Sequence, residues 1–446
     1  MYVGRISRIG AICAALLGAC GGQGSNTDTP PGVQTSSIQA SPLASTTAAA
    51  PFPGHLIVGY QGWFGCPNDF DVDAQWRHWF HGSPIAANAT VDMLPDTSAY
   101  PGDALCDSGV TLPGGATLKL FSSQSARVVD HHFDLMSRYG ITGVALQRFV
   151  SDLQDPALKR RADHLLQLVL GSAQRHAVPF FVSYDVTGAM PDSAIADIRR
   201  DWASLASASS GDAYLHDHGK PVLQIWGVGF AGNPGRADEV AALLADLKAG
   251  ANGLPAASTL GGVPTAWRTL DHDSQTDSAW RAVYLSFDIL SPWTVGRFVD
   301  EAQARDHYAT RVAADLEMLG PLGIRYLPVI FPGFSASNLS RVRAQAAPAP
   351  LNQIPRRCGR LLWTQAQLAI ATPLNAVYVA MFDEFDEGTA LLPALASATD
   401  VPAGLGSVTR DQDGCKLPPD WYLTLVSRVS ASLQSGQPLP DMPTPP

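Results

Sequence analysis

Short apolar runs recur along the chain, and polar or aromatic side chains follow most of them. The runs are rich in β-branched and aromatic residues and lack strict alternation, which is typical of strands buried on both faces. Eight runs fit this description: 55–60, 142–147, 179–184, 221–226, 259–267, 282–287, 325–330 and 376–381. The fifth contains Gly261, Gly262 and Pro264 and is the weakest match.

Longer amphipathic segments fill most of the gaps between these runs. The helical patterns cover 125–139, 155–175, 236–248, 295–319 and 421–433. Alternating strands and helices predict a parallel sheet, and eight such units predict a closed (β/α)8 TIM barrel. The first connection, 61–124, is too long for a simple loop and predicts a structured insert over the barrel mouth. A doubly wound sheet is the alternative, although no GxGxxG motif follows the first strand.

The N-terminal residues have the order of features found in a secretory signal. Arg5 and Arg8 precede an apolar run at 9–17, and no acidic residue occurs there. The following Leu-Gly-Ala-Cys, ending at Cys20, resembles the bacterial lipobox. This resemblance implies a signal peptide at 1–19 and a lipidated Cys20. An ordinary signal peptide with an accidental cysteine is the alternative, and both interpretations place the protein outside the cytoplasm.

Two segments flank the expected folded domain. Residues 20–52 are dominated by Ser, Thr, Ala, Gly and Pro without Lys or Arg, and they predict a flexible tether. Residues 436–446 are Pro-rich and predict a disordered tail. One catalytic domain is therefore expected at 53–435, anchored in the bacterial cell envelope and facing the periplasm or the cell surface.

Composition narrows the functional classes. The chain is 46% hydrophobic and 16% charged, which excludes a largely disordered protein. Its formal charge is −10 and it has no Lys/Arg run, so nucleic acid is not an expected partner. Beyond the N-terminus no stretch reaches the length of a membrane helix, so the lipid anchor is the only expected membrane contact. We expect a monomer.

Four cysteines remain after Cys13 in the signal and Cys20 are set aside. An even number in an oxidising compartment predicts disulfides, for which three pairings exist. The favoured bonds join Cys66 to Cys106 and Cys358 to Cys415, because each would fix a loop-rich segment. The spacings do not resemble a zinc ribbon, so no metal site is expected.

The carboxyl ends of the strands are where a barrel places its chemistry. Aromatic rings and directional polar groups alternate there, a mixture that suits the apolar face and hydroxyl rim of a sugar. The candidate substrate-binding residues are Tyr60, Gln61, Trp63, Gln147, Arg148, Tyr184, Asp185, Trp226, Trp267, Asp288 and Trp293. Core packing is the alternative for any single Trp.

Several of these candidates have equally plausible structural roles. Asp185 fits a helix cap, and Arg148 and Asp288 fit buried ion pairs. The pairs at 131–132 and 216–218 contain histidines, but core packing and a solvated turn are favoured over ligand binding. HExxH, GxSxG and Walker motifs are absent, and no cofactor is expected.

Four carboxylates lie within five positions directly after the eighth run: Asp383, Glu384, Asp386 and Glu387. Like charges this close favour at least one raised pKa. A protonated acid beside an ionised base is what glycosidic cleavage requires. A solvated acidic turn or a Ca²⁺ site is the alternative. The two glutamates converge only if the chain turns near Phe385, which Gly388 permits.

Residues 384–389, Glu-Phe-Asp-Glu-Gly-Thr, resemble the E-W-x-E-G-T element of glycoside hydrolase family 99, the endo-α-mannosidases and endo-α-mannanases. Phe385 and Asp386 depart from that element. More of the chain resembles the broader 71/99-like group, over 58–65, 76–79, 92–96, 120–123, 132–133, 139–141, 147–149, 184–185, 219–222, 291–293, 295–297 and 331–334.

The family-99 resemblance implies retention without an enzyme-linked sugar. By position, Glu384 would take the proton of the 2-hydroxyl group, which attacks C1, and Glu387 would be the acid/base. Asp383 and Asp386 are expected to bind substrate, an α-linked oligo- or polysaccharide of mannan type. A family 71-like α-glucanase and a non-catalytic glycan-binding lipoprotein are the alternative functions, and a structural envelope protein is a third.

Overall fold

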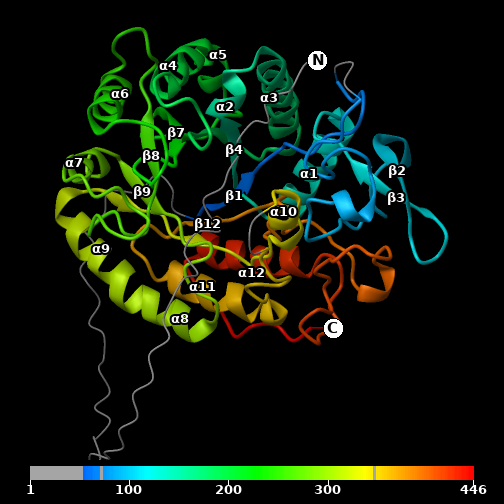
Figure 1. Ribbon diagram of the computed structural model, residues 1–446. Coiled ribbons are helices and arrows are strands. Elements are labelled where there is room, and N and C mark those ends of the chain that lie inside the picture. Colours follow the sequence, from blue (N-terminus) through cyan, green and yellow to red (C-terminus); the bar gives the residue numbers. More distant parts are fainter. Residues whose placement is uncertain (1–53, 71–73, 345–347, 446) are drawn as a thin grey trace, which may run out of the picture.

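Eight parallel strands close into a barrel in the computed structural model, which describes residues 54–70, 74–344 and 348–445 (Figure 1). The predicted signal peptide, Cys20 and the tether lie outside the described residues. Seven of the strands are continuous: β1 (Leu56–Tyr60), β4 (Gly143–Phe149), β5 (Phe180–Asp185), β7 (Lys220–Trp226), β8 (Ser258–Val263), β9 (Ile289–Pro292) and β12 (Val377–Val379). The remaining strand consists of two pieces, β10 (Arg325–Tyr326) and β11 (Val329–Ile330). The predicted (β/α)8 fold is confirmed.

The seventh strand closes the barrel in two pieces. The sheet order is β10-β9-β8-β7-β5-β4-β1-β12-β11, so β10 pairs with β9 and β11 pairs with β12. Pro328 lies between the pieces and has no N–H to give to the ladder. Its carbonyl accepts from Tyr378 N at 2.9 Å, which continues the pairing to β12. A short β6 (His216–Asp217) adds to β7 antiparallel.

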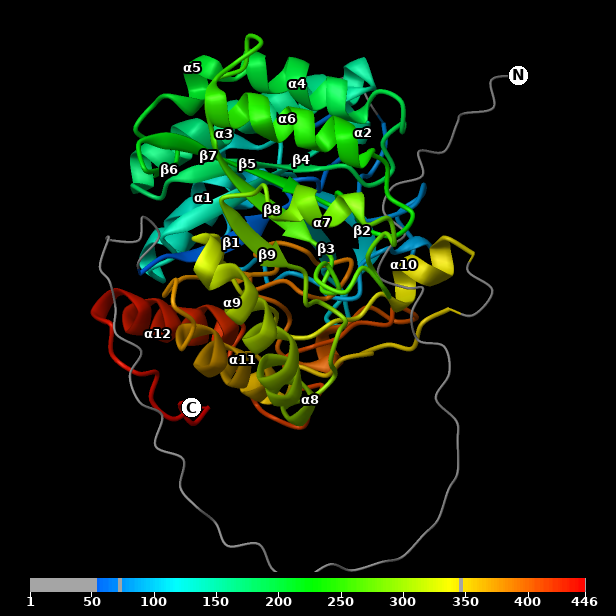
Figure 2. The same ribbon diagram turned by 90° about the vertical axis from the view of Figure 1, so that its left-hand side faces the viewer.

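Helices surround the strands, as the side view shows (Figure 2). They are α1 (Ala126–Arg138), α2 (Val150–Leu153), α3 (Pro156–His176), α4 (Ala194–Ser204), α5 (Ala206–Ser209), α6 (Ala237–Ala249), α7 (Ala279–Tyr284), α8 (Glu301–His307), α9 (Ala313–Leu319), α10 (Ser337–Val342), α11 (Arg360–Ile370) and α12 (Trp421–Ser435). A π-helical turn, Tyr308–Val312, joins α8 to α9. Short 3-10 turns cover Ala86–Asn88, Gly102–Ala104, Gly320–Leu322, Arg357–Gly359 and Ala398–Asp400.

The predicted sixth strand is wrong. The first half of the run at 282–287 belongs to helix α7, the second half is a turn, and the strand begins later, at Ile289. Trp280, Val283 and Tyr284 are buried at helical spacing, a pattern that a short apolar run does not distinguish from a strand. Asp288 therefore lies at the amino end of its strand, opposite the barrel mouth.

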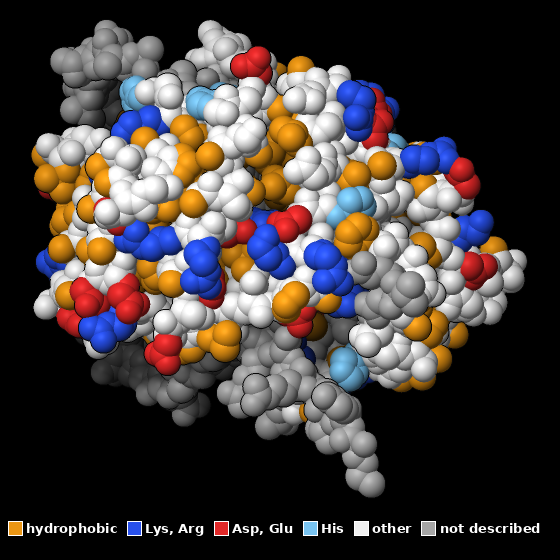
Figure 3. Space-filling view, turned by 90° about the horizontal axis from the view of Figure 1, so that it is seen from above, with side chains coloured by type: hydrophobic (Ala, Val, Ile, Leu, Met, Phe, Trp, Pro, Cys, Tyr) orange, Lys and Arg blue, Asp and Glu red, His pale blue; other side chains and the backbone are white. Residues whose placement is uncertain are grey.

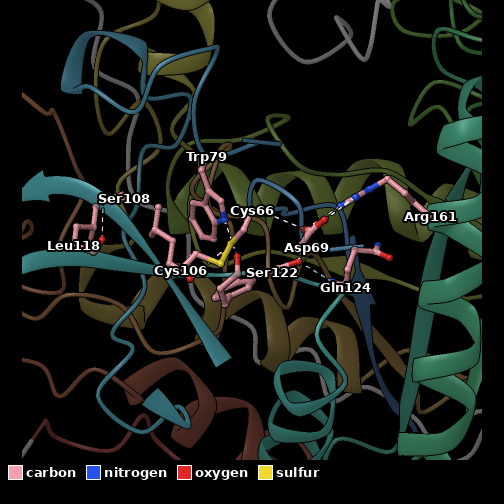
Figure 4. Close-up of a disulfide and its surroundings, with 11 residues drawn as sticks. Cys66, Asp69, Trp79, Cys106, Ser108, Leu118, Ser122, Gln124 and Arg161 are labelled. Carbon is pink, nitrogen blue, oxygen red and sulfur yellow. Dashed lines mark hydrogen bonds and ion pairs between the residues drawn. A yellow bond between two sulfur atoms is a disulfide. The ribbon is translucent and has the colours of Figure 1, made fainter. Parts of the chain in front are cut away.

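The long connection after β1 is structured, as predicted. It contains an antiparallel hairpin of β2 (Leu105–Thr111) and β3 (Thr117–Phe121), and the Cys66–Cys106 disulfide joins the hairpin to the start of the insert (Figure 4). Asp69 forms a two-pronged ion pair with Arg161 of α3, at 2.7 and 3.0 Å. The insert is thereby attached to the helix layer of the barrel.

The second favoured disulfide, Cys358–Cys415, is also present. Residues 436–445, predicted to be a disordered tail, have no helix or strand, and a few of them contact the domain. Trp363 Nε1 donates to the carbonyl of Pro440 at 3.1 Å, and Leu439 and Met442 contact the core.

The surface carries mixed charge on the face seen in Figure 3, where Lys and Arg side chains lie among Asp and Glu side chains. Within the described ranges, none of the helices combines the length and the apolar character needed to span a membrane.

Candidate active site

The acidic segment after β12 turns sharply, as the spacing of its glutamates requires. Residues 385–388 form the turn, and the N–H groups of Thr389 and Ala390 both donate to the carbonyl of Glu384, at 3.2 and 3.0 Å. Gly388 has a φ of 63°, and a Cβ there would lie 3.1 Å from Ser335. Only glycine fits this position without strain.

Phe385 anchors the turn to the insert. Its ring is fully buried against Phe64 and Trp79, at centroid distances of 5.9 and 5.8 Å. Its carbonyl accepts from the backbone N–H groups of Asp92 and Met93, at 3.0 and 3.1 Å. The acids on either side are thereby held in a fixed backbone.

A cavity lies at this end of the barrel and is lined by both glutamates. Nine of the predicted site residues line it: Gln61, Trp63, Gln147, Asp185, Trp226, Trp293, Glu384, Asp386 and Glu387. The structure therefore brings together the carboxyl ends of five strands, β1, β4, β5, β7 and β12, and the segments that follow β9 and β12.

Burial raises the pKa values of both glutamates above those of ordinary carboxyl groups. Burial, then the charges of Glu387 and Asp386, raises the pKa of Glu384 well above its ordinary value. Burial, then the charge of Asp386, raises the pKa of Glu387 to about 7. Glu384 accepts two hydrogen bonds, from Gln61 Nε2 at 3.1 Å and from Thr389 Oγ1 at 2.9 Å. Hydrogen bonds to both carboxyl oxygens favour the ionised form of Glu384.

Two further carboxylates face the cavity. Asp185 accepts from the backbone N–H of Thr187 at 2.8 Å, and burial raises its pKa to about 6. Asp386 is 2% exposed, and its Oδ2 accepts from His78 Nδ1 at 3.1 Å.

Aromatic rings form two walls of the cavity. Trp63 lies between the rings of His78 and Phe149, stacked at 4.1 and 5.4 Å. On the other wall Trp226 meets Trp293 edge to face at 5.3 Å. Indole surfaces of this kind suit the apolar face of a sugar ring.

Several buried polar atoms of this cavity have no hydrogen-bond partner among the described protein residues. They include Gln61 Oε1, Trp63 Nε1, Gln147 Oε1, Trp226 Nε1 and Asp386 Oδ1. Buried polar groups are nearly always paired, so these atoms mark a surface built for a polar ligand.

Alternation along the strands explains why some predicted residues are elsewhere. Successive side chains of a strand point to opposite faces, so Gln61, Gln147 and Asp185 face the cavity while their preceding or following neighbours do not. The Tyr60 hydroxyl forms a hydrogen bond of 2.9 Å with His132 Nδ1, and the Tyr184 hydroxyl donates to Asp201 at 2.6 Å.

Four other predicted substrate-binding residues also lie outside the lining of this cavity. Arg148 is buried and committed to Asp201 and Asp163, the ion-pair alternative, although it borders a second hollow. Trp267 is a core residue that donates to Asp315.

Asp383 and Asp288 complete the corrections. Asp383 accepts from the backbone N–H groups of Gln61 and Gly62, at 2.8 and 2.9 Å, and ties β12 to β1. Burial raises its pKa to about 7. Asp288 binds Thr259 and Lys248 at the far end of the barrel.

Sequence reasoning missed six further lining residues, five from loops and short helices and one, Phe149, from the end of β4. These are His78, Phe149, Thr187, Val295, Leu339 and Arg343. His78 belongs to the insert segment at 76–79, one of the pieces that resemble the 71/99-like group, and that resemblance was its one available signal. No group of three or more His, Cys, Asp or Glu side chains in the described part of the chain is arranged to hold a metal ion.

No protein-family model matches this chain, and no curated protein matches it in sequence. Solved structures do match. The endo-α-mannosidase of glycoside hydrolase family 99 from Bacteroides thetaiotaomicron has a TM-score of 0.60 at 14% identity, covering 86% of this chain and 98% of that one. The same enzyme in complex with bis-tris propane has a TM-score of 0.58 at 15% identity, with the same coverage. A glycoside hydrolase-like protein has a TM-score of 0.51 at 12% identity, covering 88% and 97%.

At these identities the similarity defines the fold. The protein is a (β/α)8 barrel that encloses an acidic, aromatic-walled cavity at the carboxyl end of its strands. Its architecture is shared over nearly the full length with a family 99 enzyme.

Proposed function

We propose that the protein is a glycoside hydrolase that acts on α-linked glycans, with mannan-type chains favoured. The observation that carries this proposal is the pair Glu384 and Glu387, which line one buried cavity between indole walls. The family 99 neighbour is an endo-α-mannosidase, which supports the choice of substrate. A shared fold alone does not imply a shared function, so the proposal rests on the residues of the site.

The two glutamates have distinct protonation states in this proposal. Two buried like charges repel, so the pair retains one proton near neutral pH. Glu384 accepts hydrogen bonds at both oxygens, which favours the carboxylate there. Burial raises the pKa of Glu384 further than that of Glu387, but the hydrogen bonds to both oxygens of Glu384 oppose this effect. From these bonds and from the positions of the two residues in the E-x-x-E-G-T element, we assign the shared proton to Glu387 and the role of base to Glu384.

The proposed reaction proceeds through a 1,2-anhydro sugar. Glu384 takes the proton of the 2-hydroxyl, O2 attacks C1, and the bond from C1 to the leaving oxygen breaks as Glu387 protonates that oxygen. Glu387 then takes a proton from water, whose oxygen attacks C1 and opens the three-membered ring. O2 recovers its proton from Glu384. Two inversions at C1 give net retention.

A glycan panel tests the proposal. The mature domain is incubated with α-mannans, α-glucans and aryl α-glycosides, and new reducing ends are measured. Release from α-mannan, with the first-formed anomer retained by proton NMR, is the expected result. Initial inversion would favour the α-glucanase alternative, and binding without release would favour the glycan-binding lipoprotein.

The pH dependence of kcat/KM should be bell-shaped with its maximum near neutrality. Activity needs Glu387 protonated and Glu384 ionised, so it falls at high pH as the pair loses its one proton. It falls at low pH as Glu384 takes up a second proton. Since the pKa of Glu387 is raised to about 7, the basic limb begins about two pH units above that of an ordinary carboxyl. Rates measured from pH 4 to 10 check this, and activity that rises steadily to pH 10 contradicts it.

We also propose that lipidation of Cys20 anchors the protein to the cell envelope. Cys20→Ser removes the thiol that carries the lipid, and stable attachment needs more than one acyl chain. The variant should therefore move from the membrane fraction to the soluble extracytoplasmic fraction. Fractionation followed by immunoblotting measures the shift, with Cys13→Ser as the matched control. Membrane retention of the Cys20 variant contradicts the anchor.

A further inference from the structure

Asp383 and Asp386 are three positions apart, yet their carboxylates are used in different ways. Both oxygens of Asp383 are satisfied by backbone N–H groups, of Gln61 and Gly62. Asp386 is equally inaccessible to solvent, but among the described residues only its Oδ2 has a partner. Asp383 thus has a structural role, whereas one oxygen of Asp386 remains available for a ligand.

His78 occupies one of the two oxygens of Asp386. Its Nδ1 donates to Oδ2 at 3.1 Å, and its ring stacks on Trp63 at 4.1 Å with an interplanar angle of 8°. Its carbonyl accepts from Thr90 Oγ1 at 2.5 Å. The imidazole is therefore fixed by stacking and by a hydrogen bond, and it leaves Oδ1 of this cavity-lining residue without a partner among the described residues.

Asp386 Oδ1 belongs to a set of three buried acceptors. Gln61 Oε1 and Gln147 Oε1 line the same cavity and also have no partner among the described residues. The three side chains are 2%, 9% and 8% exposed. Three unpaired acceptors call for a ligand that supplies several hydrogen-bond donors.

We propose that Asp386, oriented by His78, binds a hydroxyl or amine group of the substrate sugar and restricts the enzyme to glycans without acidic substituents. This inference rests on the proposed function and adds the class of sugar accepted. A neutral or amino sugar supplies the donors that Asp386, Gln61 and Gln147 lack. A uronic acid would bring a carboxylate to a lining with four carboxyl side chains, Asp185, Glu384, Asp386 and Glu387, against one arginine, Arg343, so net repulsion costs binding energy.

Binding is measured in a Glu387→Gln background, so that the probes are not consumed. The probes are α-1,6-linked mannotetraose, α-1,3-linked glucotetraose and β-1,4-linked tetramannuronate, titrated by calorimetry. Asp386→Ala should raise the dissociation constant of the neutral probe that binds by about 10- to 100-fold, the range for a hydrogen bond to a charged group. Tetramannuronate should not bind.

Variants of His78 separate orientation from general structure. His78→Phe keeps a ring for Trp63 but removes the donor, and should weaken binding. His78→Asn places an amide N–H close to the position of Nδ1 and should restore most of the affinity. In combination with Asp386→Ala, His78→Phe should add little further loss. Asp192→Asn, at an exposed position, is the matched control.

Each outcome decides the matter. Unchanged binding in Asp386→Ala, while the parent enzyme cleaves its glycan, overturns this inference and leaves the proposed function intact. Binding of tetramannuronate as tight as that of the neutral probe does the same. If the chain neither binds nor cleaves any member of the panel, both proposals fail. A thermal melt of each variant confirms folding, and the His78 pair provides the comparison if Asp386→Ala is unstable.

Discussion

Replacing Glu387 with Gln is expected to lower the rate of reducing-end release by about 100- to 10,000-fold, the usual contribution of a positioned acid/base. Glutamine keeps the size of the side chain but cannot give a proton to the leaving oxygen. Because the backbone of Glu387 is fixed by a hydrogen bond from Ser335 N to its carbonyl at 2.9 Å, the turn should survive the change. Binding of the glycan should persist.

The leaving group makes this prediction specific. The 2,4-dinitrophenolate group of an aryl glycoside leaves without being protonated. With this substrate the first step should therefore be nearly as fast in Glu387→Gln as in the parent enzyme. The slow second step should then give a burst of phenolate followed by a low steady rate. Glu317→Gln, at an exposed position of α9, is the matched control and should retain full activity. A Glu387→Gln enzyme with parental turnover of polysaccharide contradicts the assignment.

Buried parallel strands were the most predictable part of this molecule. Runs such as Phe180–Asp185 are apolar on both faces because helices cover one side and the barrel interior fills the other. The fifth strand was the weakest match because of its two glycines. The structure explains them, because a Cβ at Gly261 would lie 2.8 Å from the Phe287 ring and one at Gly262 would lie 2.3 Å from Trp226. Glycine there makes room for an indole that lines the cavity.

The site was predictable only as far as strand ends indicate it. The acidic cluster and its turn followed from residue spacing and from Gly388. The direction in which each strand-end side chain points did not follow from the sequence. Shifting the end of a strand by one residue turns an inward-pointing side chain into an outward-pointing one. Tyr60 and Gln61 illustrate this, since adjacent residues have opposite roles. His78 and Arg343 come from segments remote in sequence, and only tertiary packing brings them to Glu387.

A buried arginine, Arg356, holds the acidic turn, and its loss should lower both stability and activity. Arg356 is 3% exposed, and its Nη2 donates to the carbonyls of Gly388 and Ala390, at 2.7 and 2.9 Å. Its guanidinium lies 4.5 Å from the centroid of the Tyr422 ring of α12. Arg410 lies 4.7 Å from the same centroid, so two cations share one aromatic ring.

Arg356→Met should lower the free energy of unfolding by about 2–6 kcal/mol, because two buried carbonyls lose their donor at about 1–3 kcal/mol each. It should also lower kcat by about tenfold or more, since the turn that carries Glu387 is no longer held from that side. Chemical denaturation measures the first effect, and rates measured well below the melting temperature measure the second.

Arg410→Met separates the two effects of the Arg356 change. Arg410 contacts the same Tyr422 ring but donates to the carbonyls of Leu392 and Pro419, at 2.7 and 3.1 Å, beyond the turn. Its loss should reduce stability by a comparable amount while kcat of the folded protein stays near the parental value. Equal losses of kcat in the two variants would show that general loosening of the fold, and not support of residues 385–388, explains the effect. If Arg356→Met changes neither stability nor kcat, the turn is held by Phe385 and Ser335 alone.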